Sequence, residues 1–163
     1  MDADRTPAPS LFPAGPDFQD ETLREQPLAS EPLLQGRFLR VQRDTVRLPG
    51  GQHGGYGGTA IREYVCHPGA AVIAALLEDG QGGWRVVLER QWRHPLGQAI
   101  IELPAGKLDP GEPPLHCARR ELREETGYAL LEDSPLEVLP QAGYSSTGLT
   151  DETVQIVFAQ IER

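Results

Sequence analysis

Apolar and polar residues alternate along most of the chain in short segments, which is typical of half-buried β-strands. Residues 59–65 and 84–89 alternate in this way, whereas residues 70–77 are almost all apolar, as in a strand buried on both faces. The glycine-rich residues 79–83 predict the turn that joins the last two of these strands. Later strands are predicted at residues 100–104, 136–139 and 153–161.

Two short apolar runs near the beginning, at residues 38–41 and 46–48, predict a hairpin with Arg43 and Asp44 in its turn. The glycine-rich residues 49–58 resemble a phosphate-binding loop in composition but lack the spacing of one. This segment is therefore predicted to be a turn.

One amphipathic helix is predicted over residues 115–126. Leu115, Ala118 and Leu122 share one of its faces and can anchor it on a sheet. Gly127 follows at the position where a left-handed residue often ends a helix. A single strong helix late among many strands indicates an α+β fold.

The domain organisation follows from a change in composition. Residues 1–31 are rich in Pro, Asp, Glu and Ser without periodicity, which predicts a flexible N-terminal arm. The folded domain is expected over residues 32–163, including N-terminal strands at about 34–65. A chain of 163 residues is long enough for one core.

Charge and cysteine content narrow the class of protein. The net charge of −9 disfavours a partner bound through a phosphate backbone, so nucleic acid is not expected. Cys66 and Cys117 form neither a disulfide framework nor a zinc-binding pattern, which favours a reducing cytoplasm. The N-terminus lacks the pattern of a signal peptide, and no segment is apolar for long enough to span a bilayer, so no membrane association is expected.

The predicted helix carries three acidic residues near its C-terminus. Glu121 and Glu125 are four residues apart and share a face, with Glu124 beside them. Their mutual repulsion and the helix dipole disfavour this arrangement unless cations bind, and oxygen ligands of this kind suit Mg²⁺ or Mn²⁺. The alternative is a solvated helix face on which neighbouring arginines balance the acids.

The segment from Gly106 to Gly127 resembles the Nudix box. In this motif a Gly is followed after five residues by Glu, and after seven more by Arg-Glu-aliphatic-any-Glu-Glu-any-Gly. Only Tyr128 departs, since the family usually has an aliphatic residue there. The matching positions are Gly106, Glu112, Arg120, Glu121, Leu122, Glu124, Glu125 and Gly127.

The resemblance implies a Nudix fold, an α/β/α sandwich with a mixed central β-sheet and an N-terminal antiparallel strand region. It also implies a divalent metal, Mg²⁺ or Mn²⁺, held by Glu121, Glu124, Glu125 and the carbonyl of Ala105.

Other positions of the box would have structural roles. Gly106 would permit a loop turn, and Glu112 and Arg120 would form an ion pair that holds the loop against the helix.

The flanking segments resemble those of the ADP-ribose pyrophosphatase subfamily, in residues 62–70, 89–95 and 102–106. The resemblance implies that Arg62, and Arg90 or Arg93, contact the substrate, since guanidinium groups suit a diphosphate. Each could instead be a surface arginine paired with a neighbouring acid. Phe38 would stack on adenine, or else belong to the core.

A later loop, residues 143–152, resembles the subfamily loop that delivers a catalytic glutamate, which would be Glu152. Glu152 would accept a proton from the attacking water, with Asp151 or a box glutamate, Glu121 or Glu125, as the alternative base. Thr147 stands where the subfamily commonly has proline, so the substrate stays open.

The expected reaction is Mg²⁺-dependent cleavage of ADP-ribose to AMP and ribose 5-phosphate by a homodimer. The alternatives are another nucleoside diphosphate derivative, such as a nucleotide sugar, a dinucleotide cofactor or a dinucleoside polyphosphate, and a nucleotide-sensing module without turnover.

Overall fold

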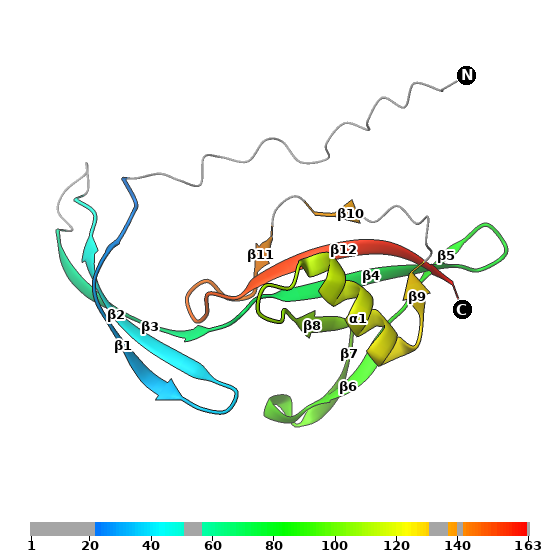
Figure 1. Ribbon diagram of the computed structural model, residues 1–163, viewed down its shortest axis with the longest axis horizontal. Coiled ribbons are helices and arrows are strands. Elements are labelled where there is room, and N and C mark those ends of the chain that lie inside the picture. The colour runs from blue at the N-terminus through cyan, green and yellow to red at the C-terminus, as the bar shows by residue number, and fades with distance from the viewer. Residues whose placement is uncertain (1–21, 51–56, 131–136, 140–141, 163) are drawn as a thin grey trace, which may run out of the picture. The chain divides into compact units, whose positions relative to one another are not determined.

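A computed structural model describes residues 22–50, 57–130, 137–139 and 142–162 of the chain (Figure 1). Its N-terminal strands are β1 (Gln26–Gln35), β2 (Arg40–Leu48), β3 (Gly58–Cys66) and β4 (Ala70–Glu78). There follow β5 (Trp84–Val86), β6 (Glu89–Arg93), the 3₁₀ turn η1 (His94–Leu96), β7 (Gln98–Glu102), β8 (Ala105–Lys107) and the helix α1 (Pro114–Thr126). The chain ends with β9 (Ala129–Leu130), β10 (Glu137–Val138), β11 (Gly143–Tyr144) and β12 (Thr153–Glu162).

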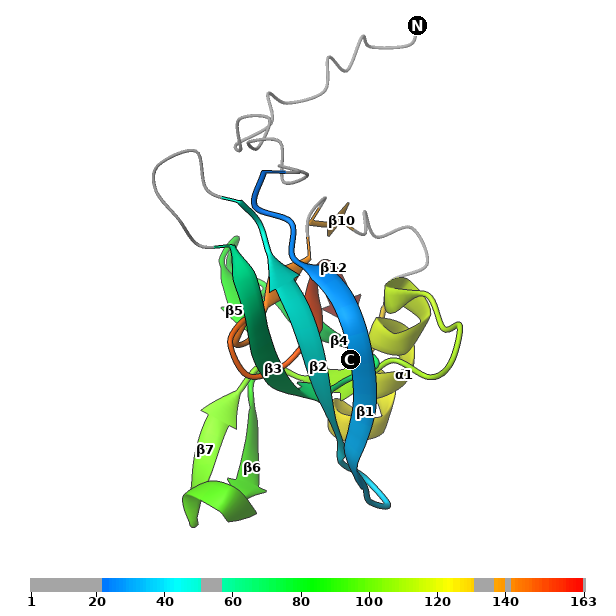
Figure 2. The same ribbon diagram turned by 90° about the vertical axis from the view of Figure 1, so that its left-hand side faces the viewer.

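The chain divides into two compact units. Residues 22–31, 43–50 and 57–62 are the described part of the first, and residues 32–42 with the described residues from Glu63 onward make up the second. β1, β2 and β3 form a three-stranded sheet in that order (Figure 2).

The N-terminal strands differ from the expected pattern. β1 begins at Gln26, inside the segment expected to be a flexible arm, whose earlier residues lie outside the described ones. The predicted hairpin at 38–48 is wrong, because β2 runs through it as one strand. Arg43 and Asp44 do not form a turn, since they face β1: Arg43 Nη1 lies 3.1 Å from Glu31 Oε1, and Asp44 accepts a hydrogen bond from Ser30.

The main sheet has seven strands in the second unit. Its path is β10-β12-β4-β5, with β8 also beside β4 and with β9 and β11 beside β12. β4 and β12 are parallel and bring Ile73 opposite Val157, whereas the other pairs are antiparallel. The expected mixed sheet is confirmed.

The helix α1 lies across β4 and β12, as Figure 1 shows, and packs on β8 and β9 as well. The core joins these elements. α1 is the one α-helix among the described residues, and it forms a single helical layer on the sheet. The predicted α+β class is confirmed. Within the described ranges, no helix is long and apolar enough to cross a membrane. The buried core consists of Ala71, Ile73, Ala75, Cys117, Ala118, Leu122, Val157, Ala159 and Ile161.

The helix ends at Thr126 as predicted and begins at Pro114, one residue before the predicted start. Its C-cap is Gly127 at φ +73°, and the Gly127 N–H donates to the Arg123 carbonyl. A side chain at this φ would be strained, so glycine fits the position.

The predicted strand at 84–89 is interrupted, because β5 stops at Val86 and Glu89 opens a separate hairpin of β6 with β7. In this hairpin Glu89 lies opposite Glu102. Parts of two predicted segments, residues 51–56 and 136, fall outside the described residues.

Candidate active site

Strand β8 passes close beneath α1 at Gly106. A Cβ atom built on Gly106 would lie 1.9 Å from the carboxylate carbon of Glu121, well inside contact distance. Only glycine leaves room for the Glu121 carboxylate at this point. The first glycine of the box is therefore required by a close approach, and its φ is not positive.

Arg120 is the centre of the polar network on the helix. Its Nε and Nη2 bind the two oxygens of Glu112 at 3.2 and 2.9 Å, which is the fork geometry of a bidentate pair. Nη1 lies 2.6 Å from Glu121, and Nη2 also donates to the Lys107 carbonyl at 3.3 Å. Hydrogen bonds from Arg120 and from the backbone of Asp109 lower the pKa of Glu112. The loop before α1 is thus fastened to the helix.

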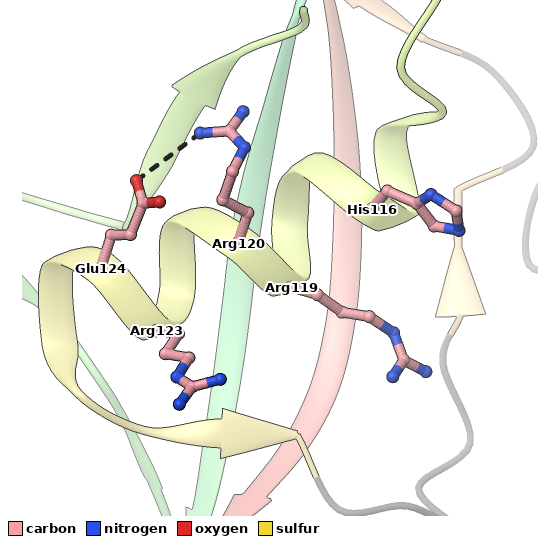
Figure 3. A pocket seen from close by; sticks show the side chains of 5 residues that line it. All are labelled: His116, Arg119, Arg120, Arg123 and Glu124. Atoms are coloured by element: carbon pink, nitrogen blue, oxygen red, sulfur yellow. Dashed lines mark ion pairs between the residues drawn. The ribbon is translucent and has the colours of Figure 1, made fainter.

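Glu124 lies at the exposed margin of this network. It is largely exposed, and its Oε2 lies 3.7 Å from Arg120 Nη1. In Figure 3, Arg120 and Glu124 point to one side of α1, whereas Arg119 and Arg123 point to the other. These four side chains and His116 line an open hollow of about 690 Å³. A single carboxylate in the hollow makes it a poor metal site, so we place the candidate centre at Glu121 and Glu125.

Glu125 contacts the backbone of β8 and lies near a second acidic residue, Glu89. Its Oε2 accepts the Ala105 N–H at 3.2 Å, and its carboxylate is near enough to Glu89 to feel the negative charge of that residue. Burial raises the pKa of both carboxyl groups, and so do neighbouring negative charges: Glu89 acts on Glu125, and Glu102 acts on Glu89.

The β6–β7 hairpin extends the acidic group. Glu102, opposite Glu89, is paired with Arg93, whose Nε donates to Glu102 Oε2 at 3.2 Å. Arg93 Nη2 lies 2.6 Å from Glu102 Oε1, yet the angles do not make a hydrogen bond there, so this buried oxygen keeps only an ionic partner. Arg93 therefore supplies positive charge beside the partly buried carboxylates of Glu102 and Glu89.

The three helix glutamates do not converge as expected. Among the residues that the structure describes, no three His, Cys, Asp or Glu side chains are arranged to hold a metal ion. Because the carboxylates repel one another, each accepts a hydrogen bond from a different donor. Glu121 accepts one from Arg120, and Glu125 accepts one from the Ala105 N–H. The donor set still fits a divalent cation, because carboxylate and carbonyl oxygens are the ligands that Mg²⁺ and Mn²⁺ prefer.

The three arginines predicted to contact the substrate lie in different parts of the chain. Arg62 belongs to the first unit, where its Nε donates to Glu25 at 3.0 Å, and this bond raises the pKa of Arg62. Arg93 is committed to Glu102, whereas Arg90 on β6 is exposed and has no ion pair with any described residue. Arg90 is thus the most available of the three for an anion.

Phe38, in the turn between β1 and β2, is exposed and not a core residue. Lys107 Nζ lies 4.0 Å from its ring centroid, a cation–π distance. An aromatic face is therefore present, with a cation over it.

The loop before β12 places Glu152 against His67. Glu152 Oε1 lies 3.2 Å from His67 Nδ1, and both side chains are partly buried. The adjacent Asp151 accepts the His67 backbone N–H at 2.7 Å. Glu152 is not among the acids near Glu125, because its contacts are with the turn after β3.

Sequence reasoning missed Glu89, Glu102 and His67. The two glutamates belong to strand segments whose pairing is not visible in a single sequence, although the hairpin register brings them together. His67 sits before a Pro-Gly turn and belongs to no short motif.

Residues 67–162 match the family of the NUDIX domain, and residues 25–65 match the nucleoside diphosphate sugar hydrolase N-terminal domain. The first match covers more than half of the chain. The chain therefore belongs to the Nudix family.

Relatives cover most of the chain. An ADP-ribose pyrophosphatase of Bacillus subtilis is 35% identical over 86% of this chain and 68% of its own. A methanol dehydrogenase activator of Bacillus methanolicus is 38% identical over 88% and 67%. An ADP-ribose pyrophosphatase of Mycobacterium tuberculosis is 40% identical over 81% of this chain and 58% of its own.

A solved structure described as an ADP compounds hydrolase shares the fold. Its TM-score is 0.64 at 18% identity, over 85% of this chain and 69% of that chain. This likeness confirms the Nudix fold.

Proposed function

We propose that the chain hydrolyses the pyrophosphate bond of ADP-ribose and releases AMP and ribose 5-phosphate. The observation that carries this proposal is the group of carboxylates beside β8, in which partial desolvation and the negative charge of Glu89 raise the pKa of Glu125. Two of the relatives cited above are named ADP-ribose pyrophosphatases, which supports the substrate.

A divalent cation, Mg²⁺ or Mn²⁺, would be held by Glu121, Glu124, Glu125 and the Ala105 carbonyl. When bound, such a cation neutralises diphosphate charge and makes water more acidic. Glu89 is an additional ligand candidate because its negative charge acts on the carboxyl group of Glu125.

The chain's own residues would bind the substrate and move the proton. Arg90 is available for a phosphate oxygen, and Arg62 and Arg93 become available if the diphosphate displaces their carboxylate partners. Phe38 offers a face for adenine stacking. Glu152 would accept the proton of the attacking water.

The test is a substrate panel of ADP-ribose, NADH, GDP-mannose and diadenosine polyphosphates with Mg²⁺ or Mn²⁺, compared by kcat/KM. ADP-ribose should have the highest ratio, and a chelator should abolish turnover until Mg²⁺ is restored. Binding without turnover would replace the enzyme by a nucleotide-sensing module. Retained turnover in chelator would refute the metal role.

A nucleotide sugar is the second candidate substrate. Residues 25–65 match a domain named for nucleoside diphosphate sugar hydrolases, and Thr147 replaces the subfamily proline. A GDP-mannose kcat/KM above that of ADP-ribose would select it.

We also propose a homodimer in a reducing cytoplasm, with residues 1–31 as an arm outside the catalytic domain. β1 is exposed at every position, which leaves a strand that a second chain can cover. Neither cysteine forms a disulfide among the described residues.

A further inference from the structure

Two turns from distant parts of the chain lie side by side at one end of the strands β4 and β12. β4 and β12 are parallel neighbours, so the segments that lead into them meet at the same end. Val65 and Thr150 form a parallel bridge there, and the Thr150 hydroxyl donates to the Val65 carbonyl at 2.9 Å. The loop that carries Glu152 is thereby fastened to the turn that carries His67.

His67 contacts this loop in two independent ways. Its backbone N–H donates to Asp151 Oδ1 at 2.7 Å, and its ring Nδ1 lies 3.2 Å from Glu152 Oε1. The same Nδ1 lies 3.2 Å from the Gly69 backbone nitrogen, in a geometry in which the Gly69 N–H donates. The ring therefore faces both an acceptor and a donor.

One nitrogen cannot serve both partners at once. Nδ1 accepts the Gly69 N–H only when it carries a lone pair, and it donates to Glu152 only when it carries a proton. If Nδ1 carried the lone pair, it would face the Glu152 carboxylate as two acceptors and repel it. An ionised Glu152 therefore selects the ring form with the proton on Nδ1.

We propose that His67 is a positioning residue for the base of the reaction. With its proton on Nδ1 it holds Oε1 of Glu152, which fixes the carboxylate and leaves Oε2 to receive the proton of the attacking water. The proton on His67 is not transferred. This inference rests on the proposed role of Glu152 and goes beyond it, because no motif of the chain assigns His67.

The contact of the His67 backbone with Asp151 allows the proposal to be tested without displacing the loop that carries Glu152. The hydrogen bond to Asp151 and the bridge between Val65 and Thr150 use no atom of the His67 ring. A substitution of the ring therefore keeps the two turns fastened and removes only the ring's own contacts, those with Glu152 and with the Gly69 N–H.

The first experiment compares His67→Asn, His67→Gln and His67→Ala. An Asn amide nitrogen can take the place of Nδ1, whereas a Gln amide nitrogen corresponds to Nε2. His67→Ala and His67→Gln should lower kcat by about tenfold or more with little change in KM, and His67→Asn should restore most of it. His116→Ala, on an exposed histidine of α1, is the matched control and should retain the parental kcat.

The second experiment places His67→Ala in a Glu152→Gln background. If His67 acts through Glu152, it should lower kcat in the parental enzyme but change it little in this background. An equal drop in both backgrounds would overturn the proposal, as would a normal kcat for His67→Ala beside a lowered one for Glu152→Gln. A normal kcat for Glu152→Gln would instead reject Glu152 as the base, and the positioning role with it.

A third measurement needs no substrate and separates this inference from the substrate assignment. The imidazole nitrogen chemical shifts of His67 should show a protonated Nδ1 in the parental protein. Glu152→Ala should return the lone pair to Nδ1, because the Gly69 N–H is then the partner that remains among the described residues. A ring whose Nδ1 is unprotonated beside an intact Glu152 would overturn the proposal.

Discussion

Gly106 and Glu121 show how one missing side chain positions a carboxylate. Replacing Gly106 with Ala places a Cβ on the Glu121 carboxylate, 1.9 Å from its carbon. The displaced atoms are the far end of a flexible side chain, so we expect the free energy of unfolding to change by less than about 1 kcal/mol. Turnover should fall by about tenfold or more, a loss of about 1.4 kcal/mol in transition-state stabilisation.

The measurement pairs kcat/KM with urea unfolding. Gly50→Ala is the control, because no atom lies within 4 Å of a Cβ at Gly50. Normal turnover of Gly106→Ala would mean that the position of Glu121 is irrelevant to the reaction.

The pair of Glu89 and Glu125 predicts a dependence of stability on pH. Partial burial raises the pKa of both groups in the folded protein, as do the charge of Glu102 on Glu89 and the charge of Glu89 on Glu125. The folded state therefore binds more protons than the unfolded chain above the ordinary glutamate pKa. In metal-free protein, stability should therefore fall as pH rises from the unfolded to the raised folded pKa, and then level off.

Glu89→Gln should flatten this fall, whereas Glu78→Gln, on an exposed glutamate of β4, should leave it unchanged. Urea unfolding in chelator at several pH values measures the difference. Identical pH profiles for Glu89→Gln and the parental protein would show that the acid pair does not carry the effect.

At the scale of elements, β4 and β12 carry the core under α1. Ile73 is fully buried at their pairing, whereas Ile101 on β7 is 70% exposed. Ile73→Ala should lower the free energy of unfolding by about 2–5 kcal/mol through lost burial and a cavity, and Ile101→Ala by less than about 0.5 kcal/mol. Equal losses in the two variants, measured by urea unfolding, would contradict this assignment of the core.

At this scale, the sequence correctly predicted the features that depend on residues close together in the chain. The helix is bounded by its own apolar face and by Gly127, and the apolar run at 70–77 falls within β4, so both were visible in the pattern. The pairing of distant segments was not visible. Arg43 and Asp44 read as a turn because their partners on β1 lie in a proline-containing segment without alternation.

In the candidate site as well, contacts within one segment were predictable, whereas contacts between distant segments were not. The box predicted the contact between Glu112 and Arg120, because the motif places Glu112 in the loop before the helix and Arg120 on the helix. It could not predict that Glu125 meets Glu89, since this contact depends on where the β6–β7 hairpin places its first residue. Nor could it predict that Glu124 turns outward to Arg120.

At the scale of the whole molecule, β1 leaves an apolar strand in contact with water. Every residue of β1 is exposed, and Leu34 is 48% exposed. Exposed strands of this kind are liable to pair or to be covered, which is why we propose that a second chain covers β1. Light scattering should then give a particle of twice the 17.8 kDa of one chain.

Leu34→Glu should shift this particle towards a single chain, because a charge buried at an interface without a partner is costly. Leu96→Glu is the matched control, since Leu96 is exposed in η1 and not in β1. If the partner chain completes the substrate site, kcat/KM of Leu34→Glu should recover as protein concentration rises. A parental protein of 17.8 kDa at micromolar concentration would refute the dimer, and a dimer unaffected by Leu34→Glu would place the interface elsewhere.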